Sequence, residues 1–169
     1  MSSSERNATQ GESWDALARA AARQGGETES RSSLRELLCL RLAGDPYALP
    51  VERVREIVRM RPVTAMPRVP REILGVISLR GEIVQVMDLR ARLALPPAEA
   101  TRRTRLVVLH GDEGEVSALM VDAVSEVLRV EEESVRPAAA GGSPFVAALC
   151  VQGRDFVSLL DLERVLDLD

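Results

Sequence analysis

The chain has 169 residues, a length typical of a single domain with a sizeable buried core. It contains one Trp, one Tyr and two Phe, so the core must be built mainly from Val, Leu and Ile. A formal net charge of −4 gives no electrostatic reason to expect a nucleic-acid partner. All 22 basic residues are arginines, which a GC-rich coding bias explains better than a need for many bidentate contacts to carboxylates.

The N-terminal segment, residues 1–33, differs from the rest in being polar and rich in Ser, Gly and charge. Trp14, Leu17, Ala18 and Ala21 have helical spacing, which predicts a short amphipathic helix on a flexible extension. A disordered tail with a chance pattern fits the composition equally well. No secretory signal is recognisable, and no apolar run has the length of a membrane span. We therefore expect a cytosolic protein that does not insert into a membrane.

Short strands dominate residues 34–169, which we expect to form one globular domain. Apolar runs bounded by turn residues predict strands at 34–42, 47–50, 76–79, 83–89, 106–110, 116–121, 145–151 and 156–160. The stretch 123–130 fits both a strand and a helix, and its position between strands favours a strand. A series of roughly nine or ten short strands with tight turns is typical of β-barrels and sandwiches.

The stretch from Gly75 to Leu93, GVISLRGEIVQVMDLRARL, is predicted to be the central hairpin. Its two apolar runs are separated by Arg80-Gly81, and glycine gives the backbone freedom that a tight reversal needs. The second run is apolar at nearly every position, whereas a strand with one solvated face alternates. We therefore expect the second strand to be buried on both faces.

Residues 51–59, VERVREIVR, fit a helix better than a strand. A strand would place Val51 on the same face as Arg53 and Arg55, whereas Val51, Val54 and Val58 have helical spacing. Because β-branched residues are weak helix formers, only about two turns are expected.

Three further segments are predicted to be helical. Residues 70–75 have proline at the first position of a helical turn. Residues 89–93 form a short turn that Asp88 or a neighbour can cap. Residues 161–168 close the chain as a helix with Asp161 as its N-cap.

The sequence offers almost nothing for catalysis, and no catalytic, metal-binding or cofactor-binding residue is assigned. The only histidine, His110, has no second histidine with which to hold a metal. Ser78 has no identifiable base, so an enzyme based on either residue is a minor alternative. Cys39 and Cys150 are interpreted as small buried hydrophobes, although their number alone does not exclude a disulfide. Asp88, Asp122 and Asp161 each follow an apolar run, where carboxylates usually cap a backbone or hold a turn.

Two charged residues stand out among apolar neighbours. Glu56 lies among valines, and Arg80 lies in the central turn between two apolar runs. Each would be costly to bury without a partner, so an ion pair between them is the economical prediction. The alternative is two separate, solvated charges.

Four segments in this order resemble the CheW family of chemotaxis coupling proteins: VERVREIV, TAMPRVPREILGVISLRGEIVQVMDLRARL, RLVVLHGDEGEVSALMVDAVSEVLRV and PFVAAL…FVSLLDLERVL. The resemblance runs from about Leu34 to Leu168. It implies a mainly β fold in which two five-stranded SH3-like β-barrels pack around a shared aliphatic core, with few short helices. It also implies a CheW-like domain over 34–169 and no enzymatic activity.

Members of this family are adaptors that couple transmembrane chemoreceptors to the histidine kinase CheA. The resemblance therefore implies two partners, the cytoplasmic tip of the chemoreceptors and the regulatory domain of CheA. It also implies a cytoplasmic protein that is recruited to receptor clusters at the membrane. The alternative is a CheW-like adaptor of a chemosensory pathway that controls surface motility, development or another non-swimming output.

The resemblance also implies where the partners bind. A groove between the barrels would take the receptor and would involve Val54, Val58, Gly75, Val124 and Val127. A separate barrel end would join the kinase. The ion pair of the family falls on Glu56 and Arg80, the same two residues that stand out by their surroundings.

This chain departs from the usual pattern of the family at three positions. Ser78 replaces an asparagine, Gln85 replaces a proline and Ala148 stands where glycine is common. None of these changes removes the expected groove.

Overall fold

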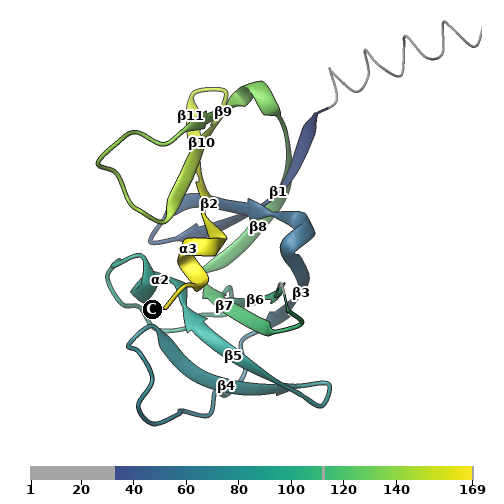
Figure 1. Ribbon diagram of the computed structural model, residues 1–169, viewed down its shortest axis with the longest axis vertical. Coiled ribbons are helices and arrows are strands. Elements are labelled where there is room, and N and C mark those ends of the chain that lie inside the picture. Colours follow the sequence, from purple (N-terminus) through teal and green to yellow (C-terminus); the bar gives the residue numbers. More distant parts are fainter. Residues whose placement is uncertain (1–32, 112, 169) are drawn as a thin grey trace, which may run out of the picture. The chain divides into compact units, whose positions relative to one another are not determined.

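A computed structural model of the protein describes residues 33–111 and 113–168 (Figure 1). The helix expected around Trp14 lies outside the described residues. Most of the described chain is β-strand, interrupted by a few helical segments of three to five residues. No helix in these two ranges is long and apolar enough to cross a membrane.

One sheet has six strands in the order β8-β1-β2-β11-β10-β9 and is here called the six-stranded half. Its strands are β1 (Leu34–Leu42), β2 (Asp45–Pro50), β8 (Ala123–Glu131), β9 (Val135–Pro137), β10 (Val146–Gln152) and β11 (Asp155–Leu160). The 3₁₀ turn η2 (Glu132–Ser134) joins β8 to β9. Strand β11 lies parallel to β2, which joins the end of the chain to the beginning of the domain.

The other sheet has five strands in the order β3-β6-β7-β5-β4 and is here called the five-stranded half. Its strands are β3 (Val54–Arg59), β4 (Ile73–Leu79), β5 (Glu82–Asp88), β6 (Arg105–His110) and β7 (Val116–Val121). The chain enters this half through η1 (Val51–Arg53) and leaves it at β8. Between β3 and β4, Thr64 forms an isolated bridge with Val76.

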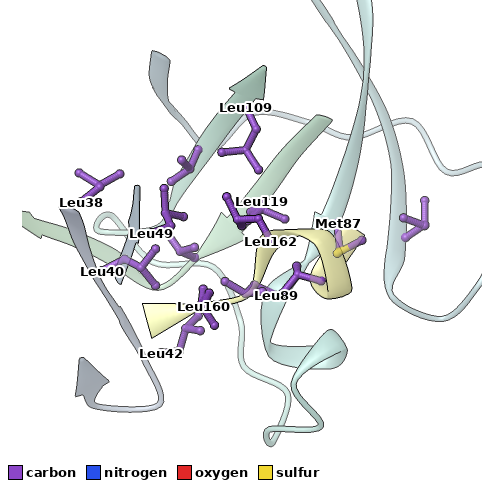
Figure 2. Packing of buried hydrophobic residues seen from close by; sticks show 14 residues of the cluster. Leu38, Leu40, Leu42, Leu49, Met87, Leu89, Leu109, Leu119, Leu160 and Leu162 are labelled. Carbon is purple, nitrogen blue, oxygen red and sulfur yellow. The ribbon is translucent and has the colours of Figure 1, made fainter. Parts of the chain in front are cut away.

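Three clusters of buried apolar side chains form the core of the domain. Each half encloses a cluster of its own, and a third lies where both halves meet (Figure 2). The third contains leucines from β1 and β2, Met87 from β5, Leu109 from β6, Leu119 from β7 and Leu162 from the C-terminal helix. The expected mainly β fold of two barrel-like units around a shared aliphatic core is confirmed. The halves have five and six strands, because the three-residue β9 adds to β10.

The longest runs of residues buried on both faces are Leu37–Leu40 in β1 and Leu106–Leu109 in β6. In β6, Leu106 and Val108 face the interior of the five-stranded half, while Val107 and Leu109 face the shared cluster. For β5 the expected double burial holds only for its C-terminal part: Met87 is buried, but Ile83 is 69% exposed. The continuous apolar run of β5 therefore includes a side chain that meets solvent.

The helix expected over 51–59 is wrong. Only η1, Val51–Arg53, is helical, and Val54–Arg59 forms strand β3. The spacing argument assumed an uninterrupted strand, whereas the 3₁₀ turn separates Val51 from the strand register. The register shifts again between Val54 and Glu56, opposite Leu109 and Val108. Such a bulge changes the face on which the next side chains lie.

The short helices follow the capping prediction. Helix α2 (Leu89–Arg92) begins after Asp88, whose carboxylate accepts hydrogen bonds from the amides of Arg90 and Ala91. Helix α3 (Leu162–Leu166) begins after Asp161, which accepts from the Arg164 amide. Residues 123–130 are a strand, as favoured, and Cys39 and Cys150 are buried free thiols. Residues 70–75 hold only a turn before β4 begins at Ile73.

Candidate functional site

The bulge in β3 divides its apolar side chains between two environments. Val54 pairs with Leu109 and packs against the shared cluster. After the bulge, Glu56 lies opposite Val108 and Val58 opposite Leu106, on the face that forms the interior of the five-stranded half. Ile57 is therefore directed to the outer face, where it is 41% exposed.

Glu56 and Arg80 form an ion pair. Arg80 Nη2 lies 2.9 Å from Glu56 Oε2, so the turn between β4 and β5 is tied to β3. The Glu56 side chain is 17% exposed, whereas that of Arg80 is 75% exposed. The second carboxylate oxygen, Oε1, is buried and has no hydrogen-bond partner among the described residues. The pair is therefore asymmetric, because the largely buried carboxylate of Glu56 is contacted from the surface by the solvated guanidinium of Arg80.

A second ion pair lies beside the first. Arg55, on the outer side of the bulge, places Nη1 2.7 Å from Oε2 of Glu82, at the start of β5. This hydrogen bond lowers the pKa of Glu82 and raises that of Arg55. Arg80 itself has φ of 51°, a left-handed conformation that bends the turn between the two pairs. Two adjacent ion pairs thus connect β3 to opposite sides of one turn.

Gly75 is required by packing on β4. Its φ is 144°, and a Cβ atom added to it would lie 2.0 Å from the carbonyl oxygen of Thr64. Thr64 and Val76 exchange two backbone hydrogen bonds of 2.9 Å at this point. The glycine therefore lets the segment after β3 lie directly against β4, which is sufficient reason for a glycine whether or not a partner binds there.

The two remaining residues of the expected groove lie on β8. Val124 is half-buried against the shared cluster, and Val127 is 53% exposed. The Ser125 hydroxyl donates to the carbonyl of Cys39 at 3.1 Å, which holds this part of β8 on β1. Val54 and Val124 therefore both pack against the shared cluster. Val58 packs inside the five-stranded half, and Gly75 lies on its strand β4. None of the three cavities described below is lined by any of the five.

Ile57 is a candidate that the sequence interpretation missed. The helical template grouped Val54 with Val58 and left Ile57 beside them. In the bulged strand, Val58 points into the interior of the five-stranded half. Ile57 points to the other face, where its cross-strand partner is Val107. The register shift that decides this has no signal in the sequence except the adjacent charged residues Arg55 and Glu56 within an apolar run.

A network of hydrogen bonds joins the two halves at Asp122, between β7 and β8. Arg90 of α2 donates to both carboxylate oxygens of Asp122, at 2.7 and 2.5 Å. The same carboxylate accepts from the amide of Ala43, in the turn between β1 and β2. The hydrogen bonds from Arg90 and Ala43 lower the pKa of Asp122. One carboxylate therefore links α2, the start of β8 and a turn of the six-stranded half.

The neighbouring arginine of α2 reaches the C-terminal helix. Arg92 donates to the backbone carbonyls of Arg164, Val165 and Asp167 at the end of α3. Its guanidinium carbon also lies 4.6 Å from the centre of the Phe145 ring. A cation at a helix C-terminus interacts favourably with the unpaired carbonyls. The sequence interpretation did not identify Arg90 or Arg92, although both lie on a turn capped by Asp88.

His110 lines a cavity of about 360 Å³ at the end of β6, together with Arg53, Glu113, Glu115 and Glu163 among others. Among the described residues, no group of three or more His, Cys, Asp and Glu side chains is arranged to hold a metal ion. A second cavity, of about 310 Å³, lies beside β11 and α3.

Comparison with known proteins agrees with this architecture. The CheW-like domain family matches residues 36–169. The probable chemotaxis protein CheW of Rhizobium etli is 35% identical over 135 residues, covering 78% of this chain and 86% of that protein. Protein FrzA of Myxococcus xanthus is 34% identical over 108 residues, covering 63% of this chain and 66% of that protein.

A solved structure shows the same fold. The crystal structure of the scaffolding protein TtCheW from Thermoanaerobacter tengcongensis matches with a TM-score of 0.75 and 26% sequence identity. The match covers 80% of this chain and 90% of that one. Because the family match runs from within β1 through α3, this chain belongs to the CheW family of chemotaxis scaffold proteins.

Proposed function

We propose that this chain is a non-enzymatic adaptor that couples transmembrane chemoreceptors to the histidine kinase CheA in a chemosensory signalling complex. The observation that carries the proposal is the family match over residues 36–169, which covers both halves and the shared cluster. An adaptor needs two separate binding surfaces on one rigid body. The shared cluster and the network at Asp122 hold the two halves together in the way such a body requires.

The receptor site is proposed on the side of the shared cluster where β3 and β8 leave apolar side chains accessible. Val54 and Val124 are half-buried there, and Val127 is exposed on β8. The proposed surface also includes Ile57, which is exposed on β3. An amphipathic helix of the receptor's cytoplasmic tip would place its apolar face on such side chains, because burial of apolar surface drives this mode of binding.

Val58 and Gly75 support this site from within. Val58 packs inside the five-stranded half, and Gly75 lets the Thr64 segment close against β4. The Glu56–Arg80 pair holds β3 against the β4–β5 turn from the same side. These residues therefore position β3, whereas Val54, Ile57, Val124 and Val127 would contact the receptor.

The kinase surface is proposed at a separate barrel end, where the regulatory domain of CheA would dock. The adaptor would then be a cytoplasmic protein recruited to receptor clusters at the membrane by its two partners, with no insertion of its own.

The test is reconstitution with purified CheA and a receptor cytoplasmic fragment. We expect the full chain to bind each protein and to form a complex that contains all three, measured by size-exclusion chromatography with light scattering. We also expect receptor control of CheA autophosphorylation only when the chain is present. A chain that binds neither protein, or that binds both only in competition, would contradict the proposal.

The alternative output of the pathway deserves a separate test, since the relatives include FrzA as well as proteins named for chemotaxis. An adaptor for surface motility or development would make the same protein contacts, so binding cannot separate the two. Deletion of the gene separates the two outputs. Loss of swimming chemotaxis favours a chemotaxis pathway, whereas a defect confined to surface motility or development favours the alternative.

A further inference from the structure

We propose that the open end of the five-stranded half, at the junction of β3 and β6, is an arginine-lined site that binds an acidic segment of a partner protein. A cavity of about 360 Å³ lies here, lined by Arg59, Met60, Thr101, Arg102, Thr104 and Arg105. The proposal does not rest on the receptor or kinase assignments, because none of these residues belongs to the surface proposed for the receptor.

The cavity gathers three arginines that have no carboxylate partner among the described residues. Eight ion pairs join side chains within residues 33–111 and 113–168, and each uses a different arginine. Arg59, Arg102 and Arg105 take part in none of them. The chain as a whole carries a net charge of −4, so three arginines without a carboxylate at one site form a local positive excess on an acidic protein.

The register of β3 and β6 places Arg59 and Arg105 opposite each other. Arg59 on β3 and Arg105 on β6 are direct cross-strand partners in the antiparallel pair. Like charges placed directly opposite each other in a sheet are unfavourable. The arrangement becomes favourable when a carboxylate lies between the two guanidinium groups, because each can then donate to it in a bidentate manner.

Hydrogen bonds within residues 101–105 order the loop that carries Arg102. Thr104 is the buried polar residue of the described chain, at 5% exposure, and its hydroxyl oxygen accepts from the Thr101 amide at 2.8 Å. The Thr101 hydroxyl in turn accepts from the Arg103 amide at 3.1 Å. Arg105 Nη1 donates to the carbonyls of Arg102 and Thr104, at 2.7 and 2.9 Å. The guanidinium of Arg105 is thus fixed beneath a closed turn that presents Arg102.

The form of the cavity favours a protein segment over a small phosphorylated ligand. Arg59, Thr101 and Arg102 are exposed, and only Thr104 is buried among the lining residues. Small-molecule sites bury most of the ligand's surface, which an open rim of this kind does not do. Acidic side chains on a protein surface need no such enclosure, and the half-buried Met60 gives an adjacent apolar contact.

The experiment uses the full chain and fluorescein-labelled hexaglutamate as the probe, with binding measured by fluorescence anisotropy at low ionic strength. The test variant is Arg59→Gln/Arg102→Gln, which removes two exposed arginines from the cavity. The matched control is Arg136→Gln/Arg154→Gln, which removes two exposed arginines of the six-stranded half that likewise have no ion-pair partner among the described residues. Thermal melts verify that both variants are folded.

We expect the wild-type chain to bind hexaglutamate, with affinity that falls as salt is raised. The test variant should bind about tenfold more weakly, since two charge-assisted contacts are lost, and the control should change less than about twofold. No binding by the wild-type chain, or equal losses in the two variants, would overturn the site. Displacement of the peptide by inorganic pyrophosphate at lower concentration than by unlabelled hexaglutamate would overturn the acidic segment as its occupant. Because receptor and CheA binding are measured separately, failure here leaves the proposed function untouched.

Discussion

The buried cluster inside the six-stranded half consists of Leu, Val, Ala and Cys side chains, whereas the interior of the five-stranded half also receives the carboxylate of Glu56. One oxygen of that carboxylate is buried without a hydrogen bond from any described group. A buried acceptor left unsatisfied costs about 1–3 kcal/mol, so the five-stranded half gives up stability that the other half keeps. Strain and unsatisfied polar groups concentrate where a surface has a task besides folding.

The five-stranded half also differs in how its edge is closed. Its strands are held at the β4–β5 turn by two ion pairs, Arg55–Glu82 and Glu56–Arg80, and at Gly75 by backbone contact with the Thr64 segment. The six-stranded half is extended by the short strand β9, while each half contains one parallel strand pair, β2 with β11 and β5 with β7. The comparison indicates that two ion pairs and Gly75 position β3, the strand that carries Val54 and Ile57. Substitutions that remove these contacts one at a time test this interpretation.

The largest effect is expected at Gly75. Gly75→Ala should destabilise the domain by about 3 kcal/mol or more, because the added Cβ collides with the Thr64 carbonyl and the backbone conformation is strained. Gly44→Ala is the matched control in the six-stranded half, with φ of 84° but open space around it. It should cost only about 1–2 kcal/mol. Urea unfolding of both variants measures the difference, and equal losses would mean that the close contact with Thr64 contributes nothing.

The second-largest loss of stability is expected at Asp122, since it joins the two halves. Asp122→Asn keeps an acceptor for the Ala43 amide but loses the charge opposite Arg90, with an expected cost of about 2 kcal/mol at neutral pH. The pKa of Asp122 is lowered from its ordinary value of 3.8, so its stabilisation is present above that pH and is lost as pH falls below it. The stability difference between wild type and Asp122→Asn should therefore shrink in acid. A difference that stays constant down to pH values well below 3.8 would contradict a role for the ionised carboxylate.

The smallest stability effect is expected at the Glu56–Arg80 pair. Arg80→Ala should cost about 1 kcal/mol, because the arginine is largely solvated but its loss leaves Glu56 without a partner. Glu56→Leu should be nearly neutral or stabilising, since it removes both the buried charge and the unsatisfied oxygen. A double-mutant cycle by thermal and urea unfolding measures the coupling. Fully additive losses would mean that the two side chains do not interact.

Much of the fold could be predicted from the sequence because its local signals agree with one another. Alternating apolar residues placed β1, and turn residues separated β6 from β7 and β10 from β11. Asp88 and Asp161 marked the starts of both short helices, since a carboxylate after an apolar run can accept from free helical amides. These features depend on neighbours in the chain.

The errors arose where a distant residue decides the local structure. Residues 54–59 form a strand because the 3₁₀ turn removes Val51 from the strand register. The inward-facing Glu56 is accommodated there by Arg80, from a turn more than twenty positions away. The bulge at Arg55 then determines that Ile57, not Val58, lies outward. The links through Arg90 and Arg92 were missed for the same reason, since their partners lie between β7 and β8 and on α3. Periodicity cannot report contacts between segments that are far apart in sequence.

The central claim is that the apolar surface of β3 and β8 binds the receptor while the kinase uses another surface. The most direct measurement is binding of Ile57→Asp, Val127→Asp and the control Phe156→Asp to a receptor fragment and to CheA by isothermal titration calorimetry. Phe156 is 59% exposed on β11 of the six-stranded half, so the control introduces the same charge at a position at least as accessible as Ile57 and Val127. We expect Ile57→Asp and Val127→Asp to weaken receptor binding at least about tenfold, because a charge on this surface must be desolvated, while CheA binding stays within about twofold. Receptor affinity unchanged in both variants, or equal loss of both partners, would contradict the claim.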